Sequence, residues 1–339
     1  MAACDFIVVG GSAGAVEGMQ QLARSFPGDL PAAVFMVLHV PADAPSMLPE
    51  ILSRSGPLPA KLPQDGEPIR PGRIYVAPAD RHLTIEDGVV RVTRGPRENR
   101  HRPAIDPLFR TAARAGGKKV IGVILSGHLD DGAAGLRAVR AHGGIAMVQD
   151  PADAAASEMP ESALQYSGAD YVLPIAELGR QLVNLACGSG AMSGGEGHTV
   201  DARNGEGNLR VSTASESCGT PSVFACPECN GVLWEFKEGE LVRFRCRVGH
   251  AYTMANLAEE QVHETEEALW AAMRALEEKA ALATRMAESM TNMKTRQRFL
   301  EQAEADRDRA ASVRKMLFAD DKEAGSADDI HSSKTTRPE

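Results

Sequence analysis

The chain contains few aromatic residues and no long apolar run. Phe, Trp and Tyr together make up only 4% of its 339 residues. No stretch reaches the roughly 20 apolar residues that a membrane-spanning helix requires, and the N-terminus lacks the basic and then apolar pattern of a signal peptide. We therefore predict a cytoplasmic protein without membrane insertion.

Positive charge and cysteine are also scarce. The 37 Lys and Arg residues are outnumbered by 46 Asp and Glu residues, which gives a formal charge of −9. Because non-specific nucleic-acid binding depends on a basic surface, we expect no nucleic-acid partner. Three of the six cysteines lie near a histidine within residues 226–250. In a cytoplasmic protein this favours a metal site over disulfides.

Short apolar runs alternate with helix-like segments through residues 1–186. The predicted strands span 6–9, 33–38, 73–76, 89–92, 120–125, 145–148 and 171–173, and the predicted helices span 16–25, 46–53, 106–115, 131–141 and 161–166. This alternation predicts an α/β domain with three layers and a doubly wound, mostly parallel sheet. Proline and glycine between residues 62 and 92 indicate an antiparallel excursion or hairpin.

The composition changes after this domain. Residues 187–222 are rich in Gly, Ser, Thr and Asn, which predicts a flexible linker. A compact cysteine-containing unit at 223–252 follows. From Met254 to residue 318 the chain contains neither proline nor glycine. Residues 253–318 are therefore predicted to form one long helix or a helical hairpin. The polar tail at 319–339 is predicted to be disordered.

A glycine-rich turn near the N-terminus is the first candidate for chemistry. Gly10–Gly14 reads Gly-Gly-Ser-Ala-Gly and joins an apolar strand to a helix-like segment. This is the G-x-S-x-G pattern that exposes a nucleophilic serine, here Ser12. The same glycines could form a phosphate-binding turn or a purely structural one. The dinucleotide fingerprint G-x-G-x-x-G does not fit, because Ser12 and Ala15 replace its second and third glycines.

Two further strands end in residues that could activate Ser12. His39 directly follows the strand at 33–38, and Asp130 and Asp131 follow the strand at 120–125. Open α/β sheets build their sites at the carboxyl ends of strands, so a base and an orienting carboxylate would meet the serine there. Alternatively, His39 ends a strand without a catalytic role, and one aspartate only caps the following helix.

Residues 5–185 resemble the catalytic domain of the chemotaxis protein-glutamate methylesterases, the CheB-type esterases. Five motifs carry the resemblance in the family's order, namely Val8–Gly14, Leu38–Pro41, Val76–His82, His101–Phe109 and Leu125–Gly135. The resemblance implies a catalytic triad of Ser12, His39 and Asp131, with Asp130 beside it. It also implies hydrolysis of glutamate methyl esters on the cytoplasmic helices of chemoreceptors and, in some members, glutamine deamidation.

The same resemblance suggests residues around the triad. The backbone N–H groups of Ala13 and of the Gly127–His128 loop would hold the oxyanion, and Arg81 and Arg102, which lie in matched motifs, are candidates for substrate contact. Ala13, Ala15 and His128 depart from the family pattern, and we expect no N-terminal phospho-acceptor domain of the family, because the strand before Ser12 begins at residue 6. An alternative is therefore a catalytically impaired signalling or scaffold protein that uses the esterase fold for binding.

The C-terminal unit carries the spacing of a zinc ribbon. Cys226, Cys229, Cys246 and His250 form a C-x2-C and a C-x3-H pair around a predicted hairpin. We predict a structural rather than a catalytic zinc, with Cys218 as an alternative to His250, and expect no cofactor for catalysis. Similar tails occur on CheB-like proteins that lack the phospho-acceptor domain. The helices at 253–318 could form a homodimer or dock on a receptor.

Overall fold

A computed structural model of the protein describes residues 4–43, 46–188 and 219–318. The chain divides after Leu257 into two compact units. The predicted tail at 319–339, most of the predicted linker at 187–222 and Cys218 lie outside the described residues. Within the described ranges, no helix combines the length and the apolar character that crossing a membrane requires.

The first unit is built on a seven-stranded sheet with the order β10-β9-β8-β1-β2-β5-β3, in which every neighbouring pair is parallel. Its strands are β1 (Phe6–Gly11), β2 (Ala33–Leu38), β3 (Ala60–Lys61), β5 (Ile74–Val76), β8 (Val120–Ile124), β9 (Ile145–Gln149) and β10 (Tyr171–Leu173). The chain builds one side of the sheet outward from β1 and then returns to add β8 on the other side. The carboxyl ends of β1, β2 and β8 therefore meet at a topological switch point, where such sheets bind ligands.

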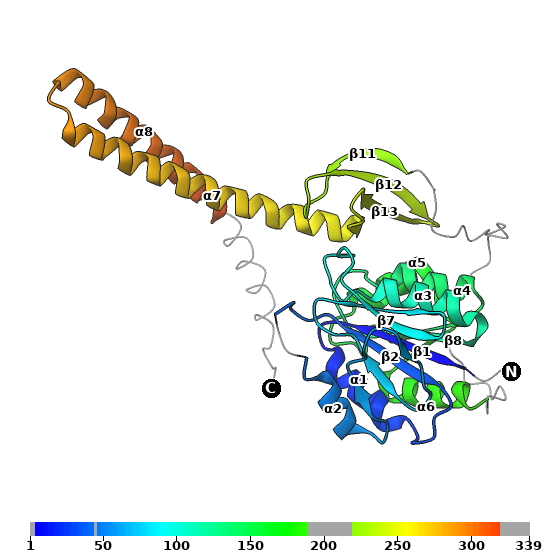
Figure 1. Ribbon diagram of the computed structural model, residues 1–339. Helices are drawn as coiled ribbons and strands as arrows, with labels where there is room; N and C mark the ends of the chain where they lie inside the picture. Colours follow the sequence, from blue (N-terminus) through cyan, green and yellow to red (C-terminus); the bar gives the residue numbers. More distant parts are fainter. Residues whose placement is uncertain (1–3, 44–45, 189–218, 319–339) are drawn as a thin grey trace, which may run out of the picture. The chain divides into compact units, whose positions relative to one another are not determined.

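Helices cover both faces of this sheet and give three layers (Figure 1). One face carries α1 (Ala15–Ser25), α2 (Leu48–Ser55) and α6 (Ile175–Ala186), and the other carries α3 (Ile105–Gly116), α4 (Ala133–Ala141) and α5 (Glu158–Ser167). A short 3-10 helix (Gly117–Lys119) leads into β8. In β1, Ile7 and Val9 enter one core and Val8 the other. Burial on both faces explains the continuous apolar runs, and the predicted doubly wound, mostly parallel sheet is confirmed.

A small antiparallel sheet lies between β5 and α3 in the chain. It consists of β4 (Glu67–Pro68), β6 (His82–Glu86) and β7 (Val89–Thr93) in the order β4-β7-β6. Asp87 and Gly88 form the turn between β6 and β7 with φ angles of 49° and 77°, a pair of left-handed conformations that suits a tight hairpin. This confirms the predicted antiparallel excursion.

Helix α4 begins at Ala133, two residues later than predicted. Asp131 belongs to the preceding loop, and Gly132 has a φ of 97°. Neither Asp130 nor Asp131 caps the helix with its side chain. The Oδ1 atom of Asp106, from α3, instead accepts hydrogen bonds from the backbone N–H groups of Gly132 and Gly135. The capping role considered for one of the paired aspartates is therefore filled by another helix.

The first unit also contains a four-stranded antiparallel sheet with the order β11-β12-β13-β14. Its strands are β11 (Thr220–Ala225), β12 (Val232–Glu238), β13 (Leu241–Cys246) and β14 (Ala251–Thr253). We call this the C-terminal sheet. Leu233, Phe244, Tyr252 and Leu257 form its small core with Cys226 and Cys246.

Two long helices follow, α7 (Met254–Ser289) and α8 (Met293–Leu317). In the second unit, buried alanines line both helices, including Ala280, Ala283 and Ala303. Ion pairs connect Glu277 with Arg314 and Lys279 with Asp306. These pairs show that the helices run antiparallel, as expected for a hairpin.

Candidate active site

Ser12 lies on the turn between β1 and α1. Gly14 has a φ of 74°, and a Cβ atom on Gly11 would lie 2.4 Å from the Cβ atom of Ala15. The turn therefore requires glycine at both positions. The N–H of Ser12 donates to the carbonyl of Ser126, 2.9 Å away, which ties the turn to the end of β8.

His39 lies beside Ser12 because β1 and β2 pair in parallel, with Gly11 opposite Leu38. The N–H of His39 extends this ladder and donates to the carbonyl of Gly11. The imidazole Nε2 atom is 2.8 Å from Oδ2 of Asp131, and both side chains are almost fully buried. Hydrogen bonding at Nε2 leaves Nδ1 as the nitrogen that can accept a proton from another group.

Several donors converge on the Asp131 carboxylate. Besides His39, it accepts hydrogen bonds from Nδ2 of Asn99 at 2.9 Å and from the N–H of Ile105 at 2.6 Å. Burial disfavours the charged form, but the bonds from His39 and Ile105 hold the pKa of this carboxyl well below its usual range. Asp131 is therefore an ionised acceptor that orients His39.

A second imidazole lies against His39. The rings of His39 and His101 are stacked, with centroids 3.6 Å apart and planes 11° apart. Burial, followed by the nearby His39, lowers the pKa of His101 to about 3. At neutral pH, His101 is therefore a neutral surface that fixes the plane of the His39 ring.

Ser12 and His39 line one pocket of about 430 Å³. The other lining residues are Val40, Pro41, Ala42, Arg97, Arg100, His101 and Arg102. Of the two predicted substrate-contact residues, Arg102 lines this pocket, whereas Arg81 is exposed and outside its lining. The guanidinium of Arg102 is bound to Asp80 and to the carbonyl of Gly95. Asp80 therefore compensates its charge.

The residues predicted near the oxyanion have different environments. In the part of the chain that the structure describes, no protein acceptor is assigned to the N–H of Ala13. The N–H of Gly127 donates to the carbonyl of Ala156. The His128 side chain is 64% exposed, and its Nδ1 atom is 3.4 Å from a carboxylate oxygen of Glu158. Of the predicted backbone donors, the N–H of Gly127 is therefore already engaged, and among the described residues no acceptor is recorded for the N–H of Ala13 or of His128.

Ser126 supports the serine turn from behind. Its hydroxyl donates to the carbonyl of Ala13 at 2.7 Å and accepts from the N–H of Ala156 at 2.8 Å. Its own N–H donates to Oε1 of Gln149. The turn is thus held by hydrogen bonds to Ser126, a residue outside the pocket lining, which restricts the movement of Ser12.

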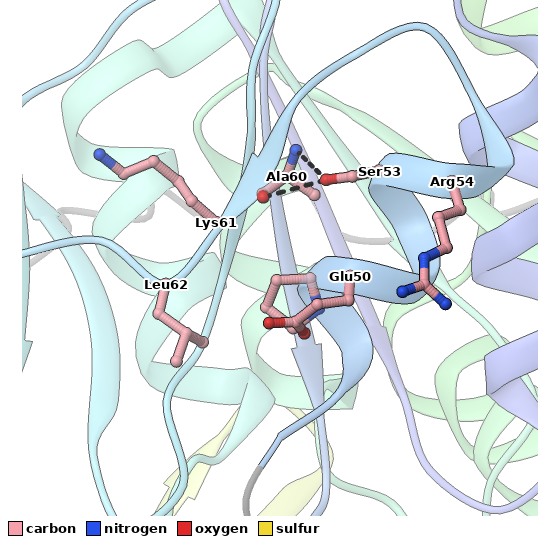
Figure 2. A pocket seen from close by; sticks show the side chains of 7 residues that line it. Glu50, Ser53, Arg54, Ala60, Lys61 and Leu62 are labelled. Carbon is pink, nitrogen blue, oxygen red and sulfur yellow. Dashed lines mark hydrogen bonds between the residues drawn. The ribbon is translucent and has the colours of Figure 1, made fainter.

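A second hollow of about 410 Å³ lies between α2 and β3 (Figure 2). The Ser53 hydroxyl there is hydrogen-bonded to both the N–H and the carbonyl of Ala60. Glu50, Arg54 and Lys61 bring charges of both signs to the rim, and the lining contains neither histidine nor cysteine. This hollow therefore offers its serine no imidazole base of the kind found beside Ser12.

The four predicted metal ligands come together in the C-terminal sheet. The ligand atoms of Cys226, Cys229, Cys246 and His250 all lie within 4.8 Å of one another. The two sulfurs of Cys229 and Cys246 are 3.6 Å apart, and the Cys246 sulfur is 3.5 Å from Nδ1 of His250. A tetrahedral zinc with bonds of about 2.0 to 2.3 Å places its ligands at about this spacing, so the residues fit the ion.

Three residues of this site escaped the sequence analysis, namely Asn99, His101 and Asp106. His101 and Asp106 lie in a matched motif but were given no role. Asn99 and Arg100 have φ angles of 49° and 69°. These left-handed conformations aim the side chains at the site, and no hydropathy pattern predicts them.

Comparison with known proteins agrees with the fold of residues 4–188. The model of the CheB methylesterase family matches residues 7–182, just over half of the chain. A protein-glutamate methylesterase/protein-glutamine glutaminase 2 of Anaeromyxobacter dehalogenans is 35% identical over 181 residues, which cover 53% of each chain. A protein-glutamate methylesterase/protein-glutamine glutaminase 1 of Xanthomonas campestris pv. campestris is 37% identical over 184 residues, which cover 53% of this chain and 51% of the relative.

A solved structure agrees as well. The crystal structure of the Thermotoga maritima CheB methylesterase catalytic domain superposes with a TM-score of 0.52 and 31% identity, covering 54% of this chain and all of that domain. The chain spans about half the length of the two curated relatives. The expected resemblance is confirmed, and the chain belongs to the CheB methylesterase family.

Proposed function

We propose that this protein is a serine esterase that hydrolyses glutamate methyl esters on the cytoplasmic helices of chemoreceptors. The observation that carries the proposal is the 2.8 Å contact between His39 and the ionised Asp131, in a site whose pocket also exposes Ser12. Nucleophile, base and orienting carboxylate thus come from three neighbouring strand ends.

In the proposed mechanism, Ser12, His39 and Asp131 have separate roles. Nε2 of His39 donates its proton to Asp131, so the lone pair on Nδ1 takes the proton of the Ser12 hydroxyl as its oxygen attacks the ester carbonyl. The Ala13 N–H stabilises the oxyanion. His39 then protonates the leaving methoxide, which departs as methanol, and an acyl-enzyme ester remains on Ser12. His39 next deprotonates a water molecule, whose attack releases the glutamate side chain and restores Ser12.

The names of the two relatives extend the proposal to glutamine. An amide carbonyl would be attacked in the same way, with ammonia leaving in place of methanol. The alternative of an impaired scaffold is not favoured, because the two relatives are named as esterases and because Ser12 and His39 line the same pocket here. The predicted cytoplasmic location and the dimer through α7 and α8 stay predictions.

The role of Ser12 is tested by methanol release from methylated receptors in membranes. Ser12→Ala removes the nucleophile and is expected to lower the rate by at least about 10⁴-fold, with an unchanged thermal unfolding curve. Ser53→Ala, which removes the serine of the other hollow, is the matched control and is expected to retain the wild-type rate. Equal methanol release by the Ser12→Ala and wild-type proteins would overturn the proposal.

We also propose that Cys226, Cys229, Cys246 and His250 hold a structural zinc ion in a zinc-ribbon-like unit. Three thiolates and one imidazole would occupy all four coordination positions of a tetrahedral zinc ion, so no position would be left for a substrate. We expect about one zinc per purified chain and a marked loss for Cys229→Ser, with Cys187→Ser as the control. Full zinc content in Cys229→Ser would exclude this ligand set.

A further inference from the structure

Residues 97–101, between β7 and α3, form a segment with an unusual backbone. The consecutive residues Asn99 and Arg100 both have left-handed φ angles, 49° and 69°. For residues other than glycine such conformations are strained, and they persist only where the surroundings enforce them. This segment therefore needs an external support.

The same segment supplies the surroundings of the catalytic pair. Asn99 is fully buried and donates to Asp131, and the His101 ring is stacked on His39. Arg97 and Arg100 line the pocket. A shift of this segment would change the position of both members of the His39–Asp131 pair.

The support comes from the C-terminal sheet. The N–H of Asn99 donates to the carbonyl of Ala251 at 2.8 Å, and the N–H of Ala251 donates to the carbonyl of Arg97 at 3.2 Å. A side-chain pair adds to this, since Arg97 contacts Glu228 at 3.0 Å. Strand β14 thus pairs with the segment along its backbone.

Arg243 of β13 adds a buried charge to the connection. Its side chain is fully buried, with Nη2 at 3.3 Å from Glu98 and Nη1 at 3.2 Å from Asp106. Burial would raise the pKa of Glu98, but Arg110 and Arg243 lower it to about 2. Glu98 is therefore ionised and binds the segment to a guanidinium that belongs to the C-terminal sheet.

A second connection reaches the residue before Asp131. Oδ1 of the buried Asp130 accepts hydrogen bonds from the Thr253 hydroxyl at 2.7 Å and from Nδ2 of Asn256 at 2.5 Å. Thr253 ends β14, and Asn256 lies in the first turn of α7. The loop that carries Asp131 is thus held from the same side as the segment 97–101.

We propose that the C-terminal sheet is a positioning element of the esterase site, in which Arg243 and Ala251 hold residues 97–101 against Asp131 and His39. The inference rests on the proposed function. Cys246 ends β13 and His250 directly precedes Ala251, so an ion held by these ligands would also fix the two strands that make the contacts. Binding of the metal ion would then affect the geometry of the esterase site, although none of the four metal ligands belongs to that site.

Arg243→Met tests this by removing the buried charge. We expect the rate at which a fluorophosphonate labels Ser12 to fall about 10- to 100-fold, the effect of a misplaced catalytic group. We also expect faster amide hydrogen exchange in residues 97–101, with β1 and β8 unchanged. Arg243→Lys keeps the charge and should recover part of the rate. Lys237→Met, at an exposed position of the neighbouring strand β12, is the matched control and should match the wild type.

Thr253→Val provides a second variant if Arg243→Met fails to fold. It removes one hydroxyl with little change in shape and should lower the labelling rate severalfold, with faster exchange at Asp130. Chelation of the wild-type metal should likewise speed exchange in residues 97–101.

The outcomes separate the two hypotheses. No labelling of Ser12 in the wild-type protein would overturn the proposed function. Normal labelling of a folded Arg243→Met protein, or reduced labelling with unchanged exchange in residues 97–101, would overturn the positioning role alone. Only a joint change in both measurements, absent from Lys237→Met, supports the inference.

Discussion

Two adjacent aspartates have opposite environments in this protein. Asp131 accepts hydrogen bonds from His39, Asn99 and a backbone N–H, which hold its pKa well below the usual range. Burial raises the pKa of Asp130, although bonds from Thr253 and Asn256 oppose the rise. One carboxylate is therefore prepared to orient an imidazole, and its neighbour anchors a loop.

This difference predicts different effects of removing each charge. In Asp131→Asn, an amide that donates toward Nε2 would favour the His39 tautomer with a proton on Nδ1, which cannot deprotonate Ser12. We expect kcat for ester hydrolysis to fall about 10⁴-fold. Asp130→Asn retains an acceptor oxygen for Thr253 and should lose less than about tenfold. Similar losses in the two variants would contradict the assignment of Asp131 as the orienting carboxylate.

The sequence indicated only part of this site. Ser12, His39 and Asp131 follow apolar strands, so their common edge could be predicted from the alternation of strands and helices. Asn99 and His101 follow no strand of the sheet. Their segment reaches the site through the left-handed conformations of Asn99 and Arg100 and through the backbone contact of Asn99 with Ala251 of β14, more than a hundred residues later in the chain. Such long-range support leaves no local pattern.

At the scale of elements, the ends of β1 and β8 approach each other closely behind Ser12. A Cβ atom on Gly127 would lie 2.6 Å from Cε of Met159 and 3.0 Å from Cβ of Ser12. No left-handed φ is recorded for Gly127, so its place in the fold reflects the close approach of the two loops rather than its backbone conformation. The position of the turn that carries Ser12 thus depends on the loop after β8 as well as on the glycines of the turn itself.

Gly127→Ala should therefore disturb both packing and activity. The added methyl group would displace Met159 or Ser12, and we expect the free energy of unfolding to fall by about 1–3 kcal/mol, with slower fluorophosphonate labelling of Ser12. Gly28→Ala is the matched control, because the nearest heavy atom to its added Cβ would be 3.8 Å away. Denaturant unfolding and labelling measure the two effects. An unchanged labelling rate in Gly127→Ala would show that the loops can separate without moving Ser12.

The strands and helices could not all be predicted equally well from the sequence. The buried parallel strands were evident because both of their faces are apolar. The strand β6 (His82–Glu86) was missed because its polar residues alternate at one face of a small sheet, and α6 (Ile175–Ala186) because it follows a proline and leads into the predicted linker. Helix α4 was extended too far because a distant carboxylate, Asp106, caps it.

At the scale of the whole molecule, a buried group of charges joins the C-terminal sheet to the α/β layers of the first unit. Glu98 contacts both Arg110 of α3 and Arg243 of β13, and Arg243 also contacts Asp106. Buried ion pairs repay their desolvation only when every partner is present, and removing one leaves an uncompensated charge. Stability is therefore expected to depend on the ionisation of Glu98.

This dependence gives a prediction with a defined sign. The pKa of Glu98 is lowered from 4.5 to about 2, so its stabilising contribution is fully present above pH 4.5 and is lost as the pH falls toward 2. A pKa change of one unit corresponds to about 1.4 kcal/mol, so the charge of Glu98 contributes roughly 3 kcal/mol to the free energy of unfolding. Glu98→Gln should be less stable than the wild type by about this amount at pH 7, and the difference should shrink steadily between pH 4.5 and pH 3.

Denaturant titrations from pH 7 to pH 3 measure this difference in the free energy of unfolding. Glu17→Gln, at an exposed position on α1, is the control. A difference that stays constant from pH 7 to pH 3 would mean that the charge of Glu98 does not stabilise the connection between the C-terminal sheet and the α/β layers.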